Sequence, residues 1–239
     1  MDVASQLARF GARERTAVVS REQTAGRGRG GRPWQAAAGS AVFATLIVRP
    51  PVAAHRLSTL PLITGVTVAE AIERISGCGV LLKWPNDVLL EVEDAAAKVA
   101  GILVTSSLRG DDLDHVLVGV GINVLGGAQD LPSGATSIQA ATGVTMTPDE
   151  VFQRLLDCFA SAYAAYVAAD GLPPLSGWLA RAALLGEVVT LEDAGRSLTG
   201  TFVGIDEDGA LLLEESALKI RKLVAGNLVR GPRATDHPE

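Results

Sequence analysis

Residues 19–34 read Val-Ser-Arg-Glu-Gln-Thr-Ala-Gly-Arg-Gly-Arg-Gly-Gly-Arg-Pro-Trp and begin within a predicted strand at 16–20. Residues 26–32, which we call the Gly-Arg loop, contain four glycines and three arginines. Glycine lets backbone N–H groups approach a ligand closely, and arginine offers a planar cation that fits phosphate or carboxylate. A strand that runs into such a loop is typical of an anion-binding site, and we expect it to bind a nucleotide phosphate.

The same loop allows other interpretations. Gly26 to Gly31 match the Gly-x-Gly-x-x-Gly pattern of dinucleotide-binding folds. That context does not fit, because Arg32-Pro33-Trp34 follows where a helix should begin, and Pro50-Pro51 replaces the expected acidic residue. The P-loop pattern, Gly-x-x-x-x-Gly-Lys-Ser/Thr, occurs nowhere in the chain. A disordered RNA-binding Arg-Gly tract and a surface loop without function stay open, although the loop lies between two apolar stretches.

Composition narrows the class of protein. The chain has 239 residues, of which 48% are hydrophobic, so it can form one large domain or a medium and a small one. Its net charge is −6, whereas nucleic-acid-binding proteins are usually basic, so the Gly-Arg loop is a local cationic site. Cys78 and Cys158 are far apart and the three histidines are scattered, which argues against zinc and disulfides. Without a signal peptide or an apolar run of about 18 residues, we expect a cytoplasmic protein with no membrane or nucleic-acid partner.

Hydrophobic periodicity predicts an α+β chain with an antiparallel sheet. Helices are expected at 2–11, 56–76, 147–169 and 174–184. Strands are expected at 16–20, 40–48, 80–84, 88–90, 98–106 and 115–124, with a loop at 91–97 and a turn at 111–114. Short strands at 188–191, 197–205, 210–213 and 218–220 predict a small C-terminal β-barrel. We therefore expect domains at 1–184 and 185–232, followed by a disordered tail at 233–239.

Two lysines, Lys83 and Lys98, stand in or at the start of apolar strands. A buried ammonium is costly unless its charge is paired or meets a ligand, and the alternative is that both side chains reach the surface or form salt bridges. Gly101, close to Lys98, favours the approach of a ligand there. The same choice between a structural role and ligand contact applies to Trp34, Trp84, Asp87 and Asn123.

Four segments together resemble the motifs of the biotin–protein ligases. They are Gly26-Arg-Gly-Arg-Gly-Gly-Arg32, Lys83-Trp-Pro-Asn-Asp87, Lys98-Val-Ala-Gly-Ile-Leu103 and Gly121-Ile-Asn123. One such motif would be weak evidence, but four in the family's order are highly specific, and the resemblance covers nearly the whole chain. It implies a fold related to class II aminoacyl-tRNA synthetase cores, with a mixed or antiparallel sheet, helices and a small SH3-like C-terminal β-barrel.

The resemblance also implies an activity in two half-reactions. Biotin and ATP, which arrives with Mg²⁺, first give biotinyl-5′-adenylate and pyrophosphate, and a lysine of a biotin carboxyl carrier protein then attacks the mixed anhydride. The residues expected to bind biotin are Gln23, Gly26, Arg27, Gly28, Arg29, Lys98 and Gly101. Those expected to bind the nucleotide are Arg29, Arg32, Trp34, Lys83, Asn86 and Asn123. No metal ligand is assigned.

Three of these residues are expected to act in catalysis. By the same resemblance, Lys98 contacts the biotin carboxylate and its acyl-phosphate product. Arg29 retains the phosphate of the adenylate. Asp87 positions the acceptor lysine or accepts its proton.

The chain departs from the family's pattern in several places. Family members carry a strand and a Ser-Thr-Asn-like motif that contacts the biotin ring, and this sequence starts where that motif should just have ended. The stretch between Asp87 and Lys98 is a few residues longer than usual, and Thr105 stands near a frequent glutamate. We therefore keep a non-catalytic biotin- or nucleotide-binding relative as the alternative. A lipoate ligase or octanoyltransferase fits less well, since the loop and the Lys-Trp-Pro-Asn-Asp motif are biotin-type signatures.

Assembly is less constrained by the sequence. The sequence leaves no room for an N-terminal helix-turn-helix, so we expect no operator binding. It is compatible with a homodimer.

Overall fold

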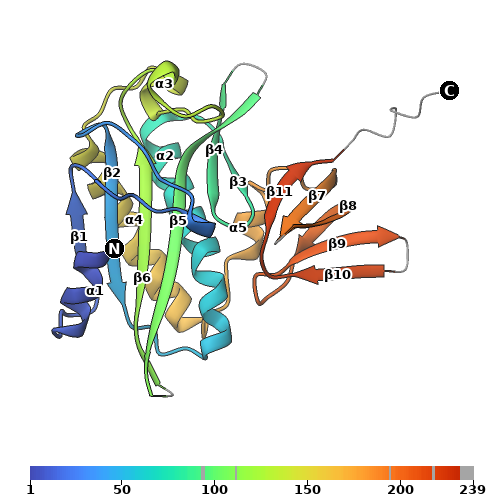
Figure 1. The fold of residues 1–239 in the computed structure, drawn as a ribbon, viewed down its shortest axis with the longest axis horizontal. Coiled ribbons are helices and arrows are strands. Elements are labelled where there is room, and N and C mark those ends of the chain that lie inside the picture. Colours follow the sequence, from blue (N-terminus) through green and yellow to red (C-terminus); the bar gives the residue numbers. More distant parts are fainter. Residues whose placement is uncertain (93–94, 111, 194, 217–218, 232–239) are drawn as a thin grey trace.

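The computed structural model describes residues 1–92, 95–110, 112–193, 195–216 and 219–231, which form two antiparallel sheets (Figure 1). The larger sheet has six strands in the order β1-β2-β6-β5-β4-β3. Their bounds are Thr16–Ser20 (β1), Ala41–Val48 (β2), Val80–Lys83 (β3), Asp87–Val92 (β4), Ala95–Arg109 (β5) and Asp112–Asn123 (β6). The predicted α+β class with an antiparallel sheet is confirmed.

Helices cover one face of the six-stranded sheet. α2 (Leu60–Ser76) and α4 (Pro148–Ala168) pack on that face and form the main core with it (Figure 1). α2 ends at Gly77, whose φ of 69° is the left-handed conformation that glycine favours. α4 begins with the predicted cap, since Thr147 and Glu150 form a reciprocal capping box. The short helices are α3 (Ile138–Thr142) and α5 (Leu175–Leu179).

The opposite face of the sheet carries α1 (Asp2–Arg9) at one end. Strand β2 shows how the two faces divide, because successive side chains of a strand point to opposite sides. Val42, Ala44, Leu46 and Val48 join the main core. Ile47 packs instead with Ala4 and Ala8 of α1. The Gly-Arg loop and the segment that follows it lie over another part of this second face.

Several predicted boundaries were wrong. The β5–β6 hairpin is longer than expected, because Asp112 to Asp114, predicted as a solvated turn, already belong to β6. β4 and β5 likewise extend into the predicted loop at 91–97, of which residues 93–94 lie outside the described residues. The helix predicted at 174–184 is only α5, since the chain then makes turns with a single bridge between Ala182 and Leu82 of β3. Helix α3 was not predicted. In the β4–β5 and β5–β6 hairpins, pairing with a neighbouring strand overrides the local signal.

The C-terminal sheet has five strands in the order β10-β9-β8-β7-β11. Their bounds are Val188–Asp193 (β7), Arg196–Ile205 (β8), Leu211–Ser216 (β9), Lys219–Leu223 (β10) and Asn227–Arg230 (β11). The predicted C-terminal β-structure is confirmed as a sheet. The predicted barrel is not found in the described part of residues 185–231, because the edge strands β10 and β11 do not pair with each other. Strand β11 was missed. Leu218 and the tail at 233–239 lie outside the described residues, and the domain boundary near 185 stays a prediction.

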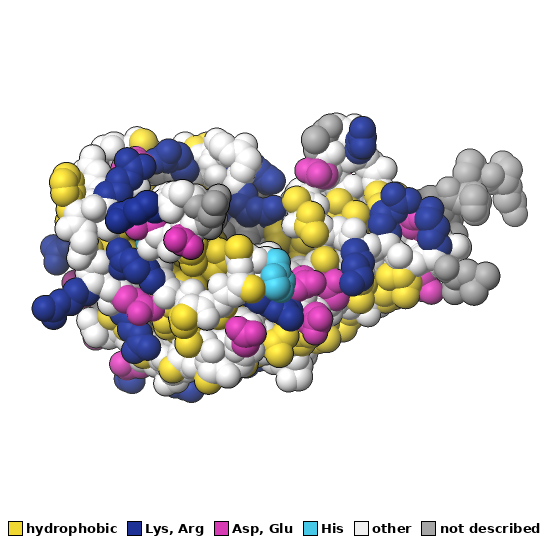
Figure 2. All heavy atoms as spheres, turned by 90° about the horizontal axis from the view of Figure 1, so that it is seen from below, with side chains coloured by type: hydrophobic (Ala, Val, Ile, Leu, Met, Phe, Trp, Pro, Cys, Tyr) yellow, Lys and Arg dark blue, Asp and Glu magenta, His cyan; other side chains and the backbone are white. Residues whose placement is uncertain are grey.

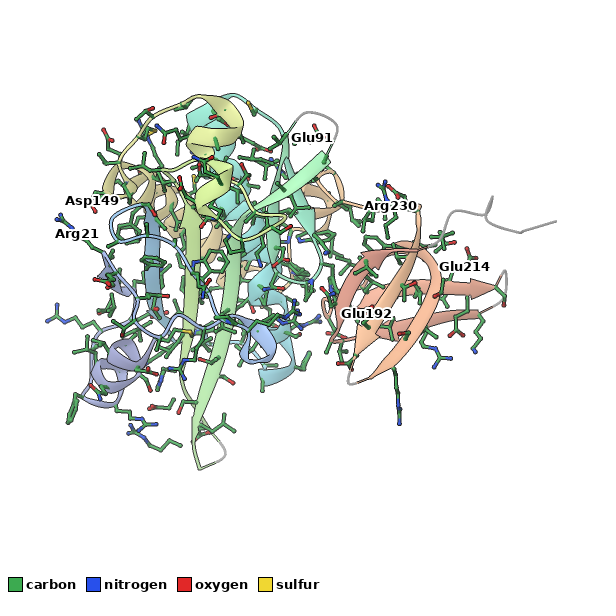
Figure 3. The ribbon with its side chains drawn as sticks, turned by 45° about the horizontal axis from the view of Figure 1, so that its top comes forward. Arg21, Glu91, Asp149, Glu192, Glu214 and Arg230 are labelled. Carbon is green, nitrogen blue, oxygen red and sulfur yellow. The ribbon has the colours of Figure 1, made fainter. Side chains whose placement is uncertain are left out.

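One turn of the C-terminal sheet, at 206–209, is bonded to the residue that follows β3 and to the segment that precedes α2. The Trp84 indole N–H donates to the Gly209 carbonyl at 3.0 Å, and the Ser58 hydroxyl donates to the Asp208 carbonyl at 2.8 Å. The Arg56 guanidinium pairs with Asp208 at 2.9 Å. Glu192 of β7 also lies on the side of the C-terminal sheet that faces the larger sheet (Figure 3). Trp84, in the middle of the Lys-Trp-Pro-Asn-Asp motif, is therefore buried as a joint between the sheets.

Candidate functional site

The free face of the six-stranded sheet has a floor made largely of glycine. Gly101 of β5 pairs with Gly121 of β6, and Leu103 of β5 pairs with Gly119 of β6. On the other side of β6, Phe43 and Thr45 of β2 stand across from Gly121 and Gly119. Three glycines without side chains let other residues approach the strands closely on this face.

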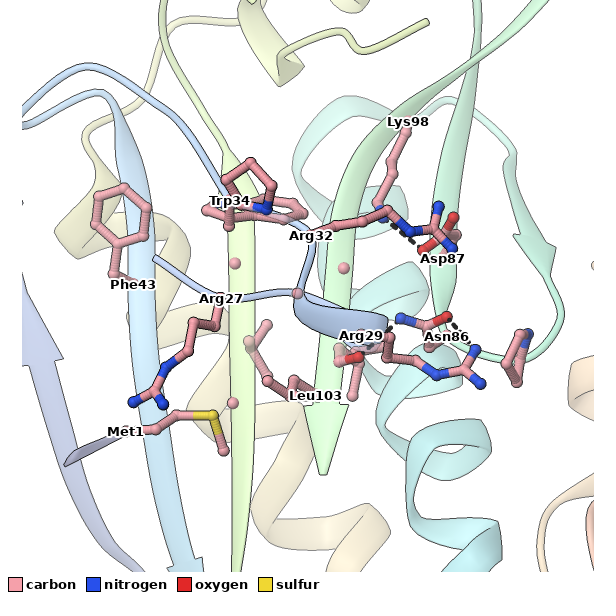
Figure 4. A pocket seen from close by; sticks show the side chains of 18 of the residues that line it. Met1, Arg27, Arg29, Arg32, Trp34, Phe43, Asn86, Asp87, Lys98 and Leu103 are labelled. Carbon is pink, nitrogen blue, oxygen red and sulfur yellow. Dashed lines mark hydrogen bonds and ion pairs between the residues drawn. The ribbon is translucent and has the colours of Figure 1, made fainter. Parts of the chain in front are cut away.

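The Gly-Arg loop and the segment that follows it lie above this floor and enclose a cavity of about 170 Å³ (Figure 4). Loop and flanking residues that line the cavity are Gln23, Arg27, Gly28, Arg29, Arg32, Pro33 and Trp34. From the other side it is lined by Trp84 to Asp87, Lys98, Ile102 and the floor residues. Segments far apart in the sequence therefore meet in one hollow.

Trp34 lies directly on the glycine floor. A Cβ atom added to Gly121 would lie 2.7 Å from the indole Cε2, and one added to Gly101 would lie 2.7 Å from Cζ3. Both positions must therefore be glycine for the indole to rest there. The Trp34 Nε1 is buried without a hydrogen-bond partner among the described residues, so the indole presents an unused donor inside the site.

Lys98 and Asp87 form the charged pair of the cavity. The Lys98 Nζ lies 2.6 Å from the Asp87 Oδ1 and 5.3 Å from the centroid of the Trp34 ring (Figure 4). Lys98 and Asp87 expose only 32% and 22% of their side chains, so the pair is shielded from water on most sides. Lys98 thus forms a salt bridge, one of the alternatives left open by the sequence, and also lines the cavity, while its contact with a ligand stays a prediction.

Arg29 reaches the same cavity from the loop. Its guanidinium donates to the Asn86 Oδ1 at 3.1 Å, and the Asn86 amide donates to the Ile102 carbonyl at 2.9 Å (Figure 4). Burial lowers the pKa of Arg29 and nearby Asp87 opposes that shift, while Arg32 lowers it further. Asn86 thus holds a half-buried cation that pairs with no carboxylate among the described residues, which leaves its charge available to an anion.

Lys83 does not line the cavity. It pairs across β3–β4 with Asp87, and burial lowers its pKa, opposed by Asp87 and reinforced by Lys98 and Arg32. The charges of the site therefore influence the pKa of Lys83, although this residue is not part of the cavity lining. Arg29 and Lys98 thus line one cavity, whereas Lys83, which the sequence assigned to the nucleotide, lies outside its lining.

Two other predicted site residues lie outside the cavity lining. Asn123, at the end of β6, is buried, and its amide donates to the Thr136 carbonyl at 3.0 Å. Gly26 supports the loop instead: its carbonyl accepts from the Trp34 N–H at 3.0 Å, and a Cβ there would lie 2.3 Å from the Trp34 carbonyl oxygen. Arg27 lines the cavity and its guanidinium pairs with Asp2 of α1.

Several lining residues were not found from the sequence. They are Met1, Phe43, Thr45, Leu103, Gly119, Gly226 and Asn227. Most lie in apolar strands, where only the side of the strand distinguishes a core residue from a lining residue. Gly226 and Asn227 come from the C-terminal sheet, and no sequence signal places that sheet against the cavity.

A second hollow adjoins the first between the two sheets. It encloses about 710 Å³ and shares Arg29, Asn86 and their neighbours with the first cavity. Its other walls come from the start of α2 and from the turn at 208–210, and they are largely apolar. The space-filling view shows the notch between the main body and the C-terminal sheet, with hydrophobic side chains at its edges (Figure 2). The site therefore opens toward the joint between the sheets.

Comparisons with known proteins agree with this geometry. Family models match as "Biotin/lipoate A/B protein ligase family" over residues 5–123 and as "Biotin protein ligase C terminal domain" over residues 184–227. A biotin--[acetyl-CoA-carboxylase] ligase of Paracoccus denitrificans is 40% identical over 84% of this chain and 84% of the relative. The bifunctional ligase/repressor BirA of Bacillus subtilis is 34% identical over 95% of this chain and 70% of the relative.

A solved structure extends the likeness to the fold. The biotin protein ligase from Aquifex aeolicus in complex with biotin and ATP has a TM-score of 0.79 and 29% identity, over 95% of this chain and 94% of that one. The chain therefore belongs to the biotin/lipoate A/B protein ligase family. Within that family its relatives are biotin protein ligases, as the four sequence motifs predicted. Among the described residues, no helix is both long and apolar enough to cross a bilayer.

Proposed function

We propose that this protein is an ATP-dependent biotin–protein ligase that activates biotin as biotinyl-5′-adenylate and transfers it to a lysine of a carrier protein. One observation carries the proposal: cations from the Gly-Arg loop and from β5 line a single cavity over a glycine floor. Relatives and a solved neighbour that bear the names of biotin ligases support the same reaction.

The first half-reaction must bring two anions together. A biotin carboxylate oxygen attacks the α-phosphorus of ATP, the bond to the β-phosphate oxygen breaks, and pyrophosphate leaves. Lys98 would hold the carboxylate, and Arg29 and Arg32 would offset the charge on the phosphates, so that the two reactants can align. Lys83 interacts electrostatically with the charged residues of the site, and its ammonium would add to the attraction for the triphosphate.

In the second half-reaction the acceptor amine attacks the carbonyl carbon of the mixed anhydride. An amide bond forms, AMP leaves, and the amine loses a proton. Asp87 is a carboxylate that lines the cavity, and its Oδ1 lies 2.6 Å from the Lys98 Nζ. It would orient the incoming ammonium or accept its proton, while Arg29 would keep the adenylate from escaping before transfer.

Magnesium would arrive with ATP. The described residues contain no group of three or more histidine, cysteine or acidic side chains that could hold a metal ion. Asp87 is the carboxylate that lines the cavity, and it is engaged by Lys98. This donor set fits an ion held mainly by phosphate oxygens and water, with the protein supplying the cations around them.

The proposal is tested by incubating the protein with labelled biotin, ATP, Mg²⁺ and a biotin carboxyl carrier domain. Label on the carrier lysine, together with biotin-dependent exchange between ATP and pyrophosphate, supports the ligase. Binding of biotin or ATP without exchange or transfer would instead identify a non-catalytic relative. The cytoplasmic location and the homodimer stay predictions.

A further inference from the structure

Asn86 lies where the larger sheet meets the cavity, and it joins two segments that are far apart in the sequence. It directly precedes β4, which begins at Asp87, and it lines the cavity. Its backbone carbonyl accepts from the Ile102 N–H at 3.0 Å, and its side-chain amide donates to the Ile102 carbonyl at 2.9 Å. Asn86 therefore satisfies both backbone groups of one residue of β5, and its side chain replaces the backbone donor that a longer β4 would supply.

The anchored side chain of Asn86 presents its oxygen to the Gly-Arg loop. That oxygen, Oδ1, accepts from the Arg29 guanidinium at 3.1 Å (Figure 4). Ile102, to which the other end of the amide is bonded, is 2% exposed and belongs to the main core. The acceptor of Arg29 is therefore tied to a packed strand in the interior of the sheet.

Arg29 itself belongs to a segment that does little to fix its side chain. Gly30 and Gly31 follow it with φ angles of 62° and 73°, a conformation that glycine adopts readily. A guanidinium on a long side chain also loses rotamer freedom when it is held in one place. Among the described residues, Asn86 accepts the hydrogen bond that the Arg29 guanidinium makes. This contact uses one of several N–H donors, so the others can meet a ligand.

The partner of Arg29 is an amide and not a carboxylate. An amide oxygen fixes the direction of the guanidinium and leaves its charge uncompensated, whereas a carboxylate would pair with that charge and compete with an anionic ligand. Arg27 of the same loop shows the contrast, because its guanidinium pairs with Asp2. Asn86 thus supplies geometry without charge at a cation to which the proposed reaction assigns a phosphate.

We propose that Asn86 is a positioning residue, which orients the Arg29 guanidinium toward the phosphate of biotinyl-adenylate and does not itself hold the nucleotide. This inference rests on the proposed function, because it takes the adenylate as the ligand. It differs from the assignment made from the sequence, in which Asn86 contacts the nucleotide directly. Both ends of its amide are already engaged within the protein, by Arg29 and by Ile102. Loss of Asn86 should therefore weaken the ligand only while Arg29 is present.

The test measures the dissociation of synthetic biotinyl-adenylate from the full-length protein in a double-mutant cycle of Asn86→Ala and Arg29→Ala. We expect Asn86→Ala alone to speed release about tenfold, the scale of a hydrogen bond to a charged group. In the Arg29→Ala background the same change should alter release by less than about twofold. Asn86→Asp keeps an oxygen acceptor but adds a negative charge, so it should release the adenylate at least as fast as Asn86→Ala. The affinity for free biotin, which lacks the phosphate, should not change in Asn86→Ala.

Gln139→Ala is the matched control, because the Gln139 amide also accepts and donates, with the Gly126 N–H and the Thr145 hydroxyl as partners, and does not line the cavity. It should leave release unchanged, and thermal unfolding checks the folding of every variant. Equal acceleration by Asn86→Ala with and without Arg29 would overturn the inference, because Asn86 would then contact the adenylate or support the site as a whole. Release from Asn86→Asp at the parent's rate would overturn it too. A parent protein that does not bind the synthetic adenylate would overturn the proposed function, and the inference with it.

Discussion

Replacing Arg29 by alanine should release biotinyl-adenylate early. The Arg29 guanidinium is half-buried, its hydrogen bond goes to the neutral Asn86 at 3.1 Å, and it pairs with no carboxylate within the described residues. Its charge is therefore free to hold the adenylate phosphate. Hydrogen bonds to charged groups contribute about 1.5–3 kcal/mol, which corresponds to about 10- to 150-fold faster release.

The assay is single-turnover release of labelled biotinyl-adenylate in the absence of carrier, followed by rapid filtration. Arg21→Ala is the matched control, because Arg21 is 86% exposed and pairs with Asp149 at 3.6 Å at the edge of the molecule near β1 (Figure 3). Burial lowers the pKa of Arg29, which means that burying this charge costs folding free energy. Removing the guanidinium should therefore not lower the melting temperature. Release from Arg29→Ala at the parent's rate would refute the role given to this cation.

Three further changes probe the floor, the wall and the joint of the site. Gly121→Ala places a methyl group 2.7 Å from the Trp34 indole. The resulting overpacking, about 1–3 kcal/mol, should weaken biotin binding and alter tryptophan fluorescence. Gly79→Ala is the control, because a Cβ there meets nothing within 4 Å, and it should change neither property. Lys83→Met should raise the melting temperature at pH 7 and raise the KM for ATP. Trp84→Phe removes the hydrogen bond to the Gly209 carbonyl, and it should cost about 1–3 kcal/mol in thermal unfolding and expose the chain between the sheets to protease.

The Lys83 prediction also has a defined pH dependence. Burial lowers the pKa of Lys83 in the folded protein below its ordinary 10.5, so charging this lysine costs folding free energy at neutral pH. The cost is relieved as pH rises from the lowered folded-state pKa toward 10.5. The difference in melting temperature between Lys83→Met and the parent should therefore shrink as pH rises. A difference that stays constant or grows would contradict the burial argument. Unchanged biotin binding in Gly121→Ala would contradict the role of the glycine floor, and unchanged thermal unfolding in Trp84→Phe would contradict the role of the Trp84 hydrogen bond.

The strongest local signals predicted the elements well. The capping box at Thr147 and the strand at 16–20 that leads into the Gly-Arg loop are present as expected. Errors came where strand pairing decides the structure. Asp112 to Asp114 look like a turn by composition but continue β6, because β5 offers them partners across the hairpin. Likewise β11 is four residues long and is a strand only because β7 lies beside it.

The sequence alone predicted an anion-binding site and, through its resemblance to the biotin–protein ligases, the class of reaction, because charge and backbone freedom belong to residue types. An alternation of glycine and arginine favours anion binding, and a lysine such as Lys98 in an apolar strand is costly unless it is paired, meets a ligand or reaches the surface. Order along the chain could not show which of these residues share a space. Only the packed sheet brings Arg29, Asn86 and Lys98 together, turns Asn123 away and aims Thr45 into the cavity. The reason is geometric: residues distant in sequence become neighbours through strand pairing, and a shift of one position along a strand moves a side chain to the other face.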